Sequence, residues 1–393
     1  MAYGTWCSAA RPEMFNLDVR SVILVSGALS LLMATVLYFL RRSFPSSIRG
    51  LGEWAAAPAI IFVATLLFGA RGAIHDLFSV VLANLLLLGG SMLMYFGSQR
   101  FFNLAPSIRP WSALILLALL PLTWFALVQP HYGVRVAMVG GLMSLIALVH
   151  ARLILRHGTR TFSSYFTGGA LLLLVFSQGM RCLSAFDLAA GDRIFDNNLP
   201  TQTAYVALNA FAILMTTIGM VLMATDKLRA EIEYLASHDT LTGALSRRVL
   251  IDACEQELER CRRKGHRMSL LMLDLDNFKA INDAHGHLVG DRALVDFTIR
   301  AKAALRRPDR FGRYGGEEFV ALLPETSLEE ALVVAERIRA AVENSTAEQA
   351  YTVSVGVAGN HADDTTVDAV LSRADTALYA AKAAGRNCVR PAA

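Results

Sequence analysis

Hydrophobic and polar positions divide this sequence into two halves. Between residues 21 and 223 the chain is a series of apolar runs with few charges, whereas charged residues appear at ordinary globular density from Asp226 onward. A membrane-spanning helix needs about 20 mainly apolar residues to cross about 30 Å of hydrocarbon. The first half therefore predicts an α-helical membrane bundle over residues 21–223, and the second half predicts a soluble domain.

Seven apolar runs meet this length criterion. They lie near residues 21–40, 54–70, 77–97, 111–128, 134–155, 166–186 and 203–223. The second run is the shortest, with Pro58 inside it and Arg71 at its end, so six spans remain an alternative to seven. The first run is too long for a cleaved signal peptide, and too few basic residues precede it.

The distribution of Lys and Arg predicts the orientation of the bundle. With seven spans the two ends lie on opposite sides, and the side with more basic residues is cytoplasmic. One side carries Arg41, Arg42, Arg49, Arg100, Arg109, Arg152, Arg156, Arg160, Lys227 and Arg229. The other carries Arg11, Arg20, Arg71, Arg135 and Arg193, with Asp76, Asp187, Asp192 and Asp196. We therefore expect residues 1–20 to be extracytoplasmic and the C-terminal half to be cytoplasmic.

The last apolar run continues into the soluble half without a break. Val221, Leu228 and Leu235 keep a helical spacing with no Gly or Pro between them, which predicts a helical linker over residues 224–238. Their seven-residue spacing is that of a coiled-coil seam, but two heptads do not exclude a single amphipathic connector. Either form makes a stiff connection between the two halves.

The soluble half alternates helical and strand patterns. Helices are expected near 246–264, 290–305, 328–343 and 366–384, with strands at 268–273 and 351–357 and a hairpin around Gly315. The unbroken apolar run from Met268 to Leu273 is typical of a buried central strand. A sheet with helices on one face is the simplest arrangement of these elements.

Charge and cysteine content argue against two kinds of site. The net charge of +4 is small and is explained by the predicted topology, and no basic stripe with interleaved aromatic residues appears, so no nucleic-acid partner is expected. The five cysteines are an odd number without Cys-x-x-Cys spacing. Neither a disulfide framework nor a zinc site is indicated.

Acidic residues gather at two predicted strand ends. Residues 315–318, Gly-Gly-Glu-Glu, form a predicted hairpin turn, whose glycines permit turn dihedrals and close approach of a ligand. Asp274 ends the first strand, and Lys279 follows. Asp274, Glu317 and Glu318 together suit a magnesium ion held with substrate phosphates, and Lys279 adds a cation for the phosphates. In isolation, a solvated acidic turn and a solvated helix charge would explain these residues equally well.

Seven blocks of residues follow in order along the soluble half. They are Asp239-Thr240-Leu241-Thr242-Gly243, Leu273-Asp274-Leu275-Asp276, Phe278-Lys279-Ala280-Ile281-Asn282-Asp283, Gly286-His287 with Gly290-Asp291, Gly315-Gly316-Glu317-Glu318-Phe319, Ser354-Val355-Gly356, and Ala374-Asp375 through Gly385-Arg386-Asn387. In this order and spacing the soluble half resembles a GGDEF domain, the diguanylate cyclase family. The Glu317 form of the signature is one that active members use.

The resemblance implies a fold and a reaction. The fold is an adenylyl-cyclase-like palm, an α/β (α+β) domain over residues 239–391 with a central, mostly antiparallel sheet. The reaction is the condensation of two GTP into cyclic di-GMP with release of two pyrophosphates. The membrane half would then place the protein in the bacterial cytoplasmic (inner) membrane.

The resemblance also implies a metal site. Asp274 and Glu317 resemble the family's magnesium ligands, with the Leu275 carbonyl as a further ligand and Glu318 in support. Glu317 is also the family's proposed base for the attacking ribose 3′-hydroxyl. The expected cofactor is Mg²⁺ or Mn²⁺, two ions per GTP.

Substrate contacts follow from the same register. The phosphate contacts are expected from the backbone at Asn277, Phe278 and Gly316 and from the side chains of Lys279, Lys382 and Arg386. The last two are four residues apart and are predicted to project from one face near a helix C-terminus. Asn282 and Asp291 resemble the residues that read guanine. A carboxylate can accept both the N1 and the N2 protons of guanine, so Asp291 favours GTP.

Arg306 and Asp309 form an Arg-x-x-Asp motif in the register of the family's inhibitory product site. Arg306 can bind a phosphate or stack on guanine, and Asp309 can accept hydrogen bonds from the guanine edge. A polar helix end before Pro308 is the ordinary alternative.

Two functions remain open at this point. The first is an active diguanylate cyclase, which must form a homodimer because each domain holds one GTP. The second is a degenerate receptor that binds cyclic di-GMP at Arg306 and Asp309 without making it. The expected partners of the membrane half are lipid and an unidentified signal ligand. Arg181 is its one candidate intramembrane site, with snorkelling or pairing with Asp187 as alternatives.

Overall fold

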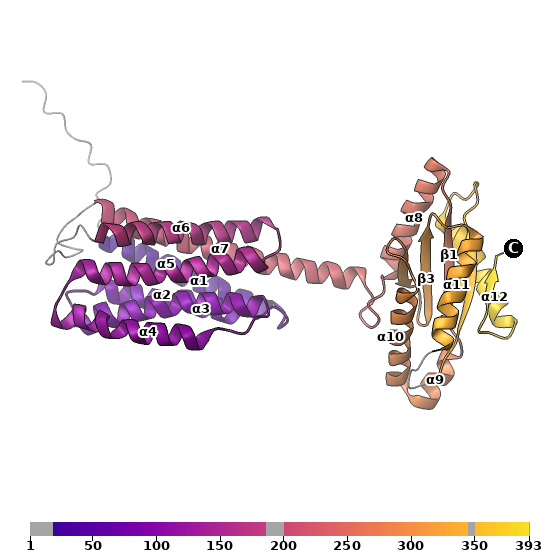
Figure 1. Cartoon of the computed structure of the whole chain (residues 1–393), viewed down its shortest axis with the longest axis horizontal. Coiled ribbons are helices and arrows are strands. Elements are labelled where there is room, and N and C mark those ends of the chain that lie inside the picture. Colours follow the sequence, from indigo (N-terminus) through magenta and orange to yellow (C-terminus); the bar gives the residue numbers. More distant parts are fainter. Residues whose placement is uncertain (1–18, 186–199, 345–349, 393) are drawn as a thin grey trace, which may run out of the picture. The chain divides into compact units, whose positions relative to one another are not determined.

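A computed structural model of the chain describes residues 19–185, 200–344 and 350–392 (Figure 1). The chain divides into two compact units, which meet between Arg229 and Ala230. This boundary falls inside the segment 224–238 that the sequence predicts as a linker. Asp187, the suggested partner of Arg181, lies outside the described residues.

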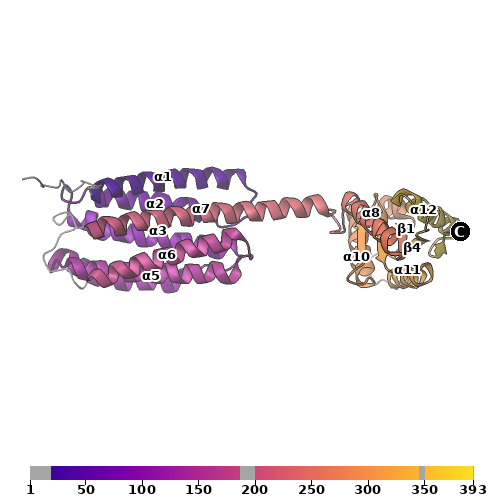
Figure 2. The ribbon, with the colours of Figure 1, turned by 90° about the horizontal axis from the view of Figure 1, so that it is seen from above.

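The first unit is a bundle of long helices that run side by side (Figure 2). Its elements are α1 (Val19–Ser43), α2 (Leu51–Gly69), the π-helical turn η1 (Leu77–Leu82), α3 (Ala83–Phe101), α4 (Ile108–Thr123), the π-helical turn η2 (Trp124–Val128), α5 (Tyr132–His157), α6 (Phe162–Ser184) and α7 (Pro200–Ser237). Within the described ranges, seven helices are long and apolar enough to cross a membrane. The second of these, Leu51–Gly69, contains Pro58 and is still 19 residues long, which favours seven spans over six.

The outward surface of this bundle is apolar. On α4, Leu116, Leu117 and Leu120 are each about two-thirds or more exposed. Large contiguous apolar surfaces are rare on soluble monomers. Exposed leucines on helices of this length are what a lipid-facing surface requires.

Hydrogen bonds between buried side chains join three helices inside the bundle. The indole Nε1 of Trp54 on α2 donates to Met94 O at 3.2 Å and to Ser98 Oγ at 3.1 Å, both on α3. Ser98 Oγ in turn lies 2.7 Å from Nε2 of His150 on α5. Because no water is available in a dry interior, such polar groups must find partners within the protein. This network fixes the packing of α2, α3 and α5.

Helix α7 is continuous over 38 residues, from Pro200 to Ser237. This confirms the helical continuity that the spacing of Val221, Leu228 and Leu235 predicts. Two consecutive residues hold it to the bundle: Asp226 Oδ2 accepts from Ser163 Oγ at 2.6 Å, and Lys227 Nζ donates to Phe101 O at 2.9 Å.

The second unit contains a five-stranded sheet in the order β2-β3-β1-β4-β5. The strands are β1 (Met268–Leu275), β2 (Arg310–Arg313), β3 (Glu318–Pro324), β4 (Val353–Gly359) and β5 (Val389–Pro391). Three pairs are antiparallel, but β4 and β5 are parallel. The sheet is therefore mixed, which corrects the expected mostly antiparallel sheet. A short strand after the last helix adds to the edge in the direction of β4.

Helices cover both faces of this sheet, so the expectation of helices on one face was wrong. On one face α9 (Phe278–His285), α10 (His287–Ala303) and α11 (Leu328–Glu343) pack against Leu271, Leu273 and Leu275 of β1. On the other face α8 (Arg247–Lys264) and α12 (Val367–Ala383) pack against Met268, Leu270 and Met272. Every residue of β1 is buried, as a strand covered on both faces must be.

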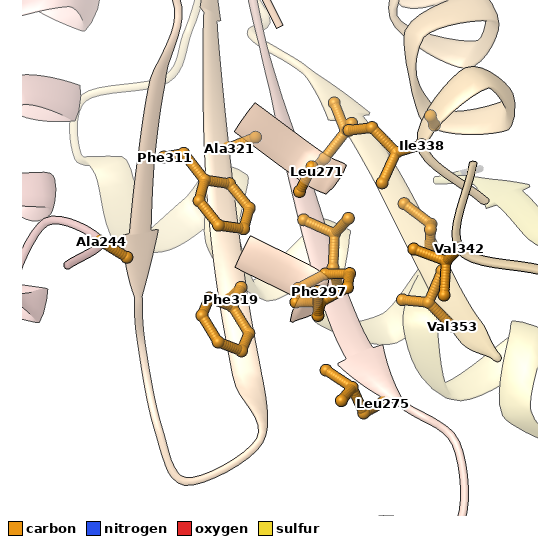
Figure 3. Close-up of a cluster of buried hydrophobic side chains, with 14 of the residues drawn as sticks. Ala244, Leu271, Leu275, Phe297, Phe311, Phe319, Ala321, Ile338, Val342 and Val353 are labelled. Carbon is orange, nitrogen blue, oxygen red and sulfur yellow. The ribbon is translucent and has the colours of Figure 1, made fainter. Parts of the chain in front are cut away.

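The face under α10 has an aromatic centre (Figure 3). Phe311 of β2 and Phe319 of β3 stack with their ring centroids 5.3 Å apart, and Phe297 of α10 meets Phe319 edge-on at 4.9 Å. Phe319 directly follows the Gly-Gly-Glu-Glu turn. The turn is therefore attached at its C-terminal end to the rigid centre of the domain.

Candidate active site

The carboxylates predicted on two strands lie opposite each other. In the antiparallel register of β1 and β3, Asp274 pairs with Glu318, at the end where β1 leaves the sheet. Directly opposed residues in such a pair have Cβ atoms about 5 Å apart. Asp274 is only 4% exposed. The structure thus brings together two of the predicted metal-site residues.

Residues 315–318 form the predicted hairpin. β2 ends at Arg313 and β3 begins at Glu318, and the amides of Tyr314 and Gly315 both donate to Glu318 O, at 2.8 Å and 3.1 Å. A Cβ on Gly315 would lie 2.7 Å from Glu318 Oε2, while one on Gly316 would meet nothing within 4 Å.

Neither glycine of this turn has a positive φ. The expected use of glycine for unusual turn dihedrals was therefore wrong. Gly315 is required because the Glu318 carboxylate passes close to its backbone. Gly316 instead leaves open space beside the turn, into which a ligand can approach the backbone.

Burial and repulsion from neighbouring carboxylates raise the pKa values of Asp274 and Glu317. Burial raises the pKa of Glu317, and the charges of Asp274 and Glu318 raise it further. Burial also raises the pKa of Asp274, although Lys382 opposes this effect. Clustered carboxylates that resist ionisation are typical of sites that bind a cation or carry out chemistry.

A lysine ammonium group supplies the positive charge at this point. Nζ of Lys382, in the last turn of α12, lies 2.8 Å from Asp274 Oδ2. Gly356 of β4 makes this approach possible, because a Cβ there would overlap the carbonyl oxygen of Ala374 in α12. The backbone of α12 therefore lies directly on the sheet.

The donor set fits a hard divalent cation in part. Asp274, Glu317 and Glu318 offer carboxylate oxygens, and the Leu275 carbonyl lies next to them in the chain. Across the described ranges, however, no three acidic, histidine or cysteine side chains are grouped closely enough to hold a metal ion alone. Magnesium commonly uses one or two carboxylates and completes its shell with water and substrate phosphates. The residues present fit that mode of binding.

The predicted substrate residues of α9 and α10 lie at the start of α9 and where α9 meets α10. Asn277 precedes α9 in a left-handed conformation (φ 56°), and Lys279 is exposed in its first turn. Asn282 lies against Gly290, where a Cβ would overlap its side-chain oxygen. Asp291 is the next residue of α10. The helical turn therefore brings Asn282 and Asp291 together, as joint readers of one base would require. Phe278 is buried in the core and anchors the start of α9.

Arg386 does not lie where the sequence places it. Helix α12 ends at Ala383, and Arg386 follows in a turn with φ 64°, its amide donating to Ala381 O at 3.2 Å. Lys382 and Arg386 therefore do not share a helix face. The glycine at 385, with φ 111°, ends the helix before the second cation.

The sequence does not reveal the role of Asp276. Its carboxylate accepts from Ser354 Oγ at 2.6 Å, Thr352 Oγ1 at 2.7 Å and the Asn387 amide at 3.0 Å. It does not cap α9, because Asn277 occupies that position. Asp276 ties the end of β1 to β4 and to the turn that holds Arg386. Only the repeated Leu-Asp in the sequence hints at a second buried acid.

Arg313 is a second residue that sequence reasoning missed. Its guanidinium donates to Gly316 O, at 2.6 Å and 2.9 Å, and to both carboxylate oxygens of Asp239, at 3.1 Å and 3.2 Å. Despite burial, hydrogen bonds from Thr242 and Arg313 hold the pKa of Asp239 below its usual value. Arg313 thus links the Gly-Gly-Glu-Glu turn to Asp239, which follows α7.

Arg306 and Asp309 lie in the turn before β2. Asp309 Oδ2 accepts from the amide of Arg306 at 2.8 Å, and the Arg306 side chain is exposed. The tetrapeptide is thus a stable turn that presents a guanidinium to solvent. This geometry fits both the product-site interpretation and the ordinary polar turn.

Comparison with known proteins now identifies the second unit. Residues 236–388 match the family model described as "Diguanylate cyclase, GGDEF domain". This segment is a GGDEF domain. The match includes Asp274, Lys279, Asp291, the turn at 315–318 and Lys382, which the fold brings to one end of the sheet.

Relatives of the GGDEF domain occur in proteins of different architecture. Response regulator PleD of Caulobacter vibrioides is 41% identical over 175 residues, covering 42% of this chain and 38% of its own length. The bifunctional diguanylate cyclase/cyclic di-GMP phosphodiesterase MucR of Pseudomonas aeruginosa is 32% identical over 339 residues, covering 76% of this chain and 49% of its own length. The chain thus spans less than half of each of these relatives.

Among solved structures, the GGDEF domain of DgcB from Caulobacter crescentus in complex with c-di-GMP is 33% identical. The likeness covers 40% of this chain and 96% of that chain, with a TM-score of 0.38.

Proposed function

We propose that the protein is a membrane-bound diguanylate cyclase that condenses two GTP into cyclic di-GMP and releases two pyrophosphates. The observation that carries the proposal is the pairing of Asp274 with Glu318 at the strand end, with Lys382 on Asp274, in a domain that matches the family model. Degenerate members lose signature acids or the lysine and aspartate that contact substrate. This chain keeps all of them.

The residues at the turn divide the chemistry among them. Asp274, Glu317 and the Leu275 carbonyl would hold Mg²⁺ or Mn²⁺, two ions per GTP, with Glu318 in support. When bound, these ions neutralise charge that develops on the phosphates. Glu317 accepts the proton of the ribose 3′-hydroxyl, and its raised pKa brings that carboxylate closer to the range of a useful base. The open space at Gly316 admits the phosphates beside the turn.

Cations around the site bind the triphosphate. Lys279, in the first turn of α9, and the backbone at Asn277 and Phe278 contact the phosphates at the positive end of that helix. Lys382 moves from Asp274 to a phosphate oxygen when substrate arrives, and Arg386 contributes from the turn after α12. Each of these cations thus lies beside phosphate oxygens whose negative charge increases as the new phosphodiester bond forms.

Guanine is selected by Asn282 and Asp291. The Asp291 carboxylate accepts from N1 and N2 of guanine, and adenine lacks this pair of donors. A site built for such hydrogen bonds rejects a base that leaves its polar groups unpaired. GTP is therefore the proposed substrate.

The reaction requires two copies of the chain. Each GGDEF domain holds one GTP, and the 3′-hydroxyl of one must attack the α-phosphorus of the other, so a homodimer is the active form. The seven apolar helices support a location in the bacterial cytoplasmic membrane, and the continuous helix α7 supports regulation of the GGDEF domain by the bundle.

Product feedback at Arg306 and Asp309 completes the proposal. The exposed guanidinium of Arg306 is free to bind cyclic di-GMP. Arg306→Ala should leave the initial rate unchanged and weaken inhibition by added cyclic di-GMP at least tenfold. Inhibition equal to that of the wild type would remove this site from the proposal.

The central experiment measures turnover by the purified full-length protein. With GTP and Mg²⁺ it should form cyclic di-GMP and pyrophosphate, and Glu318→Gln should abolish synthesis while the protein stays folded. Glu259→Gln, on the exposed face of α8, is the matched control and should retain full activity. A dimeric wild-type protein that makes no product but binds cyclic di-GMP would instead be the degenerate receptor.

A further inference from the structure

The helical bundle contains a cavity of about 190 Å³. Its walls come from α1, η1, α2, α3, α5, α6 and α7, and its residues lie in the halves of these helices that the predicted topology makes extracytoplasmic. Toward the middle of the bundle the wall is apolar, with Met33, Ile61, Met143 and Leu214. None of the residues proposed for the cyclase reaction lines the cavity.

Polar atoms without partners line the outer part of this cavity. Tyr132 Oη, Gln178 Oε1, Asn209 Oδ1 and Arg181 Nε are buried and have no hydrogen-bond partner in the described protein. The first three side chains belong to residues more than nine-tenths buried. Leaving one such atom unpaired costs about 1–3 kcal/mol. Four of them around one space indicate a binding site for a polar group.

The charge of the cavity wall is positive. Arg71, Arg135 and Arg181 all line it, and no Asp or Glu of the described ranges does. None of the three makes an ion pair within the described ranges, although the charge of Asp76 reaches Arg135. Cations inside a membrane-spanning bundle are costly and are retained where they bind something. The three guanidinium groups therefore favour an anionic ligand.

We propose that this cavity binds a small amphiphilic organic anion. Its carboxylate accepts hydrogen bonds from Arg135, Arg181 and Tyr132 Oη, while its apolar body extends toward Met143. A cavity of about 150 Å³ holds benzene, so 190 Å³ admits a ligand of roughly six to ten non-hydrogen atoms. A diacyl phospholipid is far too large. The charged outer end and the apolar inner end together favour an anion with an apolar body over neutral and cationic ligands.

The site connects directly to the helix that enters the GGDEF domain. Asn209 belongs to α7, which continues without a break to Ser237. A ligand in this cavity contacts Arg181 of α6 and lies beside Asn209 of α7, so it bridges the two helices. This inference concerns ligand binding alone, so it is measured independently of the proposed cyclase activity.

Two glycines of α5 provide a matched pair of probes. A Cβ on Gly140 would sit 3.5 Å from Gln178 O and 3.8 Å from Gln178 Oε1, which is ordinary contact distance. Gly140→Ala therefore fits, but it adds a methyl group beside the unpaired amide oxygen and narrows the cavity. A Cβ on Gly141 would meet nothing within 4 Å, so Gly141→Ala changes the same helix without entering the cavity.

The experiment uses full-length protein in phosphatidylcholine nanodiscs, titrated with octanoate, phenylacetate, octanol and octylamine. Calorimetry should show saturable binding of the two carboxylates, and both should raise the melting temperature. Octanol and octylamine should bind at least tenfold more weakly than octanoate. Equal affinity for octanol and octanoate would overturn the proposal, because the arginines would then contribute nothing.

Variants then locate the binding. Arg135→Gln, Arg181→Gln and Gly140→Ala should each weaken octanoate binding at least tenfold, whereas Arg156→Gln, at the exposed far end of α5, and Gly141→Ala should bind as the wild type does. Wild-type affinity in Arg181→Gln and Gly140→Ala together would refute the site. So would loss of octanoate binding in nanodiscs that contain phosphatidylglycerol, since lipid would then be the occupant. Binding without any cyclase turnover would support this site and overturn only the enzymatic proposal.

Discussion

The ammonium group of Lys382 lies 2.8 Å from the Asp274 carboxylate, where the proposed metal ligand would otherwise face two other acids. Burial raises the pKa of Asp274 and the lysine opposes that rise. Without substrate the lysine thus acts as a substitute cation. It must leave Asp274, at least in part, before a divalent ion can bind there.

Replacing Lys382 should separate metal affinity from catalysis. Lys382→Met removes the competing cation, so Mn²⁺ or Mg²⁺ should bind more tightly in the absence of GTP. The same change removes a phosphate contact, so kcat/KM for GTP should fall at least tenfold. Metal titration by calorimetry and initial-rate measurements check both effects. Lys264→Met, on the exposed end of α8, should alter neither. Weaker metal binding in Lys382→Met would contradict the competition.

Alanine substitutions of the two turn glycines should impair the enzyme for different reasons. Gly315→Ala places a methyl group 2.7 Å from Glu318 Oε2, so it should displace that carboxylate and weaken metal binding. Gly316→Ala touches nothing in the protein, so it should leave metal affinity intact and raise KM for GTP by roughly tenfold or more. Equal metal affinities in the two variants, measured without nucleotide, would show that Gly315 is not needed for the position of Glu318.

Arg313 should prove to be a positioning residue. It holds Gly316 O and both oxygens of Asp239, so Arg313→Gln should loosen the turn and lower kcat about tenfold or more, with little change in KM. Arg313→Lys should restore only part of the rate, because lysine cannot bridge two acceptors in the planar arrangement of a guanidinium. Arg263→Gln serves as the control. A kcat for Arg313→Gln equal to that of the control would exclude this role.

The pH dependence of stability should reveal the Asp364–Arg373 ion pair. Arg373 Nη1 and Nη2 donate to the two oxygens of Asp364 at 2.8 Å and 2.6 Å, and this holds the pKa of Asp364 below its ordinary 3.8. A lowered folded pKa contributes stability above the unfolded pKa, and the contribution is lost as pH falls through the folded value. Asp364→Asn should therefore destabilise the GGDEF domain by about 2 kcal/mol near pH 7.

The difference between the wild type and Asp364→Asn should shrink below about pH 3.8, where the wild-type carboxylate begins to take up protons. Denaturant unfolding at several pH values measures this difference in the free energy of unfolding. A difference that stays constant from pH 7 to pH 3 would show that the stabilisation does not depend on the charge of Asp364.

Local pattern in the sequence predicts much of this fold. Apolar runs of about 20 residues are long enough to mark the helices of the bundle, and the run from Met268 to Leu273 marks the central strand. The same run predicts helices on both faces of the sheet, because consecutive residues of a strand point to opposite faces and here all of them are apolar. The expectation of a single layer of helices was wrong because it rested on the number of helices and strands. It ignored the alternating directions of the apolar side chains along the strand.

Contacts between distant segments could not be predicted in the same way. Asp276 is understood only when Ser354 and Asn387 lie beside it, and Arg313 only when Asp239 does. The parallel strand Val389–Pro391 is too short for its partner to be read from its own residues. Likewise, the polar atoms of Tyr132, Gln178 and Asn209 look unremarkable in the sequence, and only the packed bundle shows that they lack partners. The end of the first predicted strand, by contrast, indicated Asp274 and Lys279, and family register supplied Asp291, without any knowledge of these contacts.

Gly356 has a consequence for judging whether relatives of this domain are functional. It contacts neither nucleotide nor metal in the proposed mechanism, yet any side chain at this position would push α12, and Lys382 with it, away from the sheet. A relative could therefore retain every acid and lysine of the signature and still have lost activity through one added methyl group. Annotation of such sequences should check the residue at this structural position as well as the signature itself.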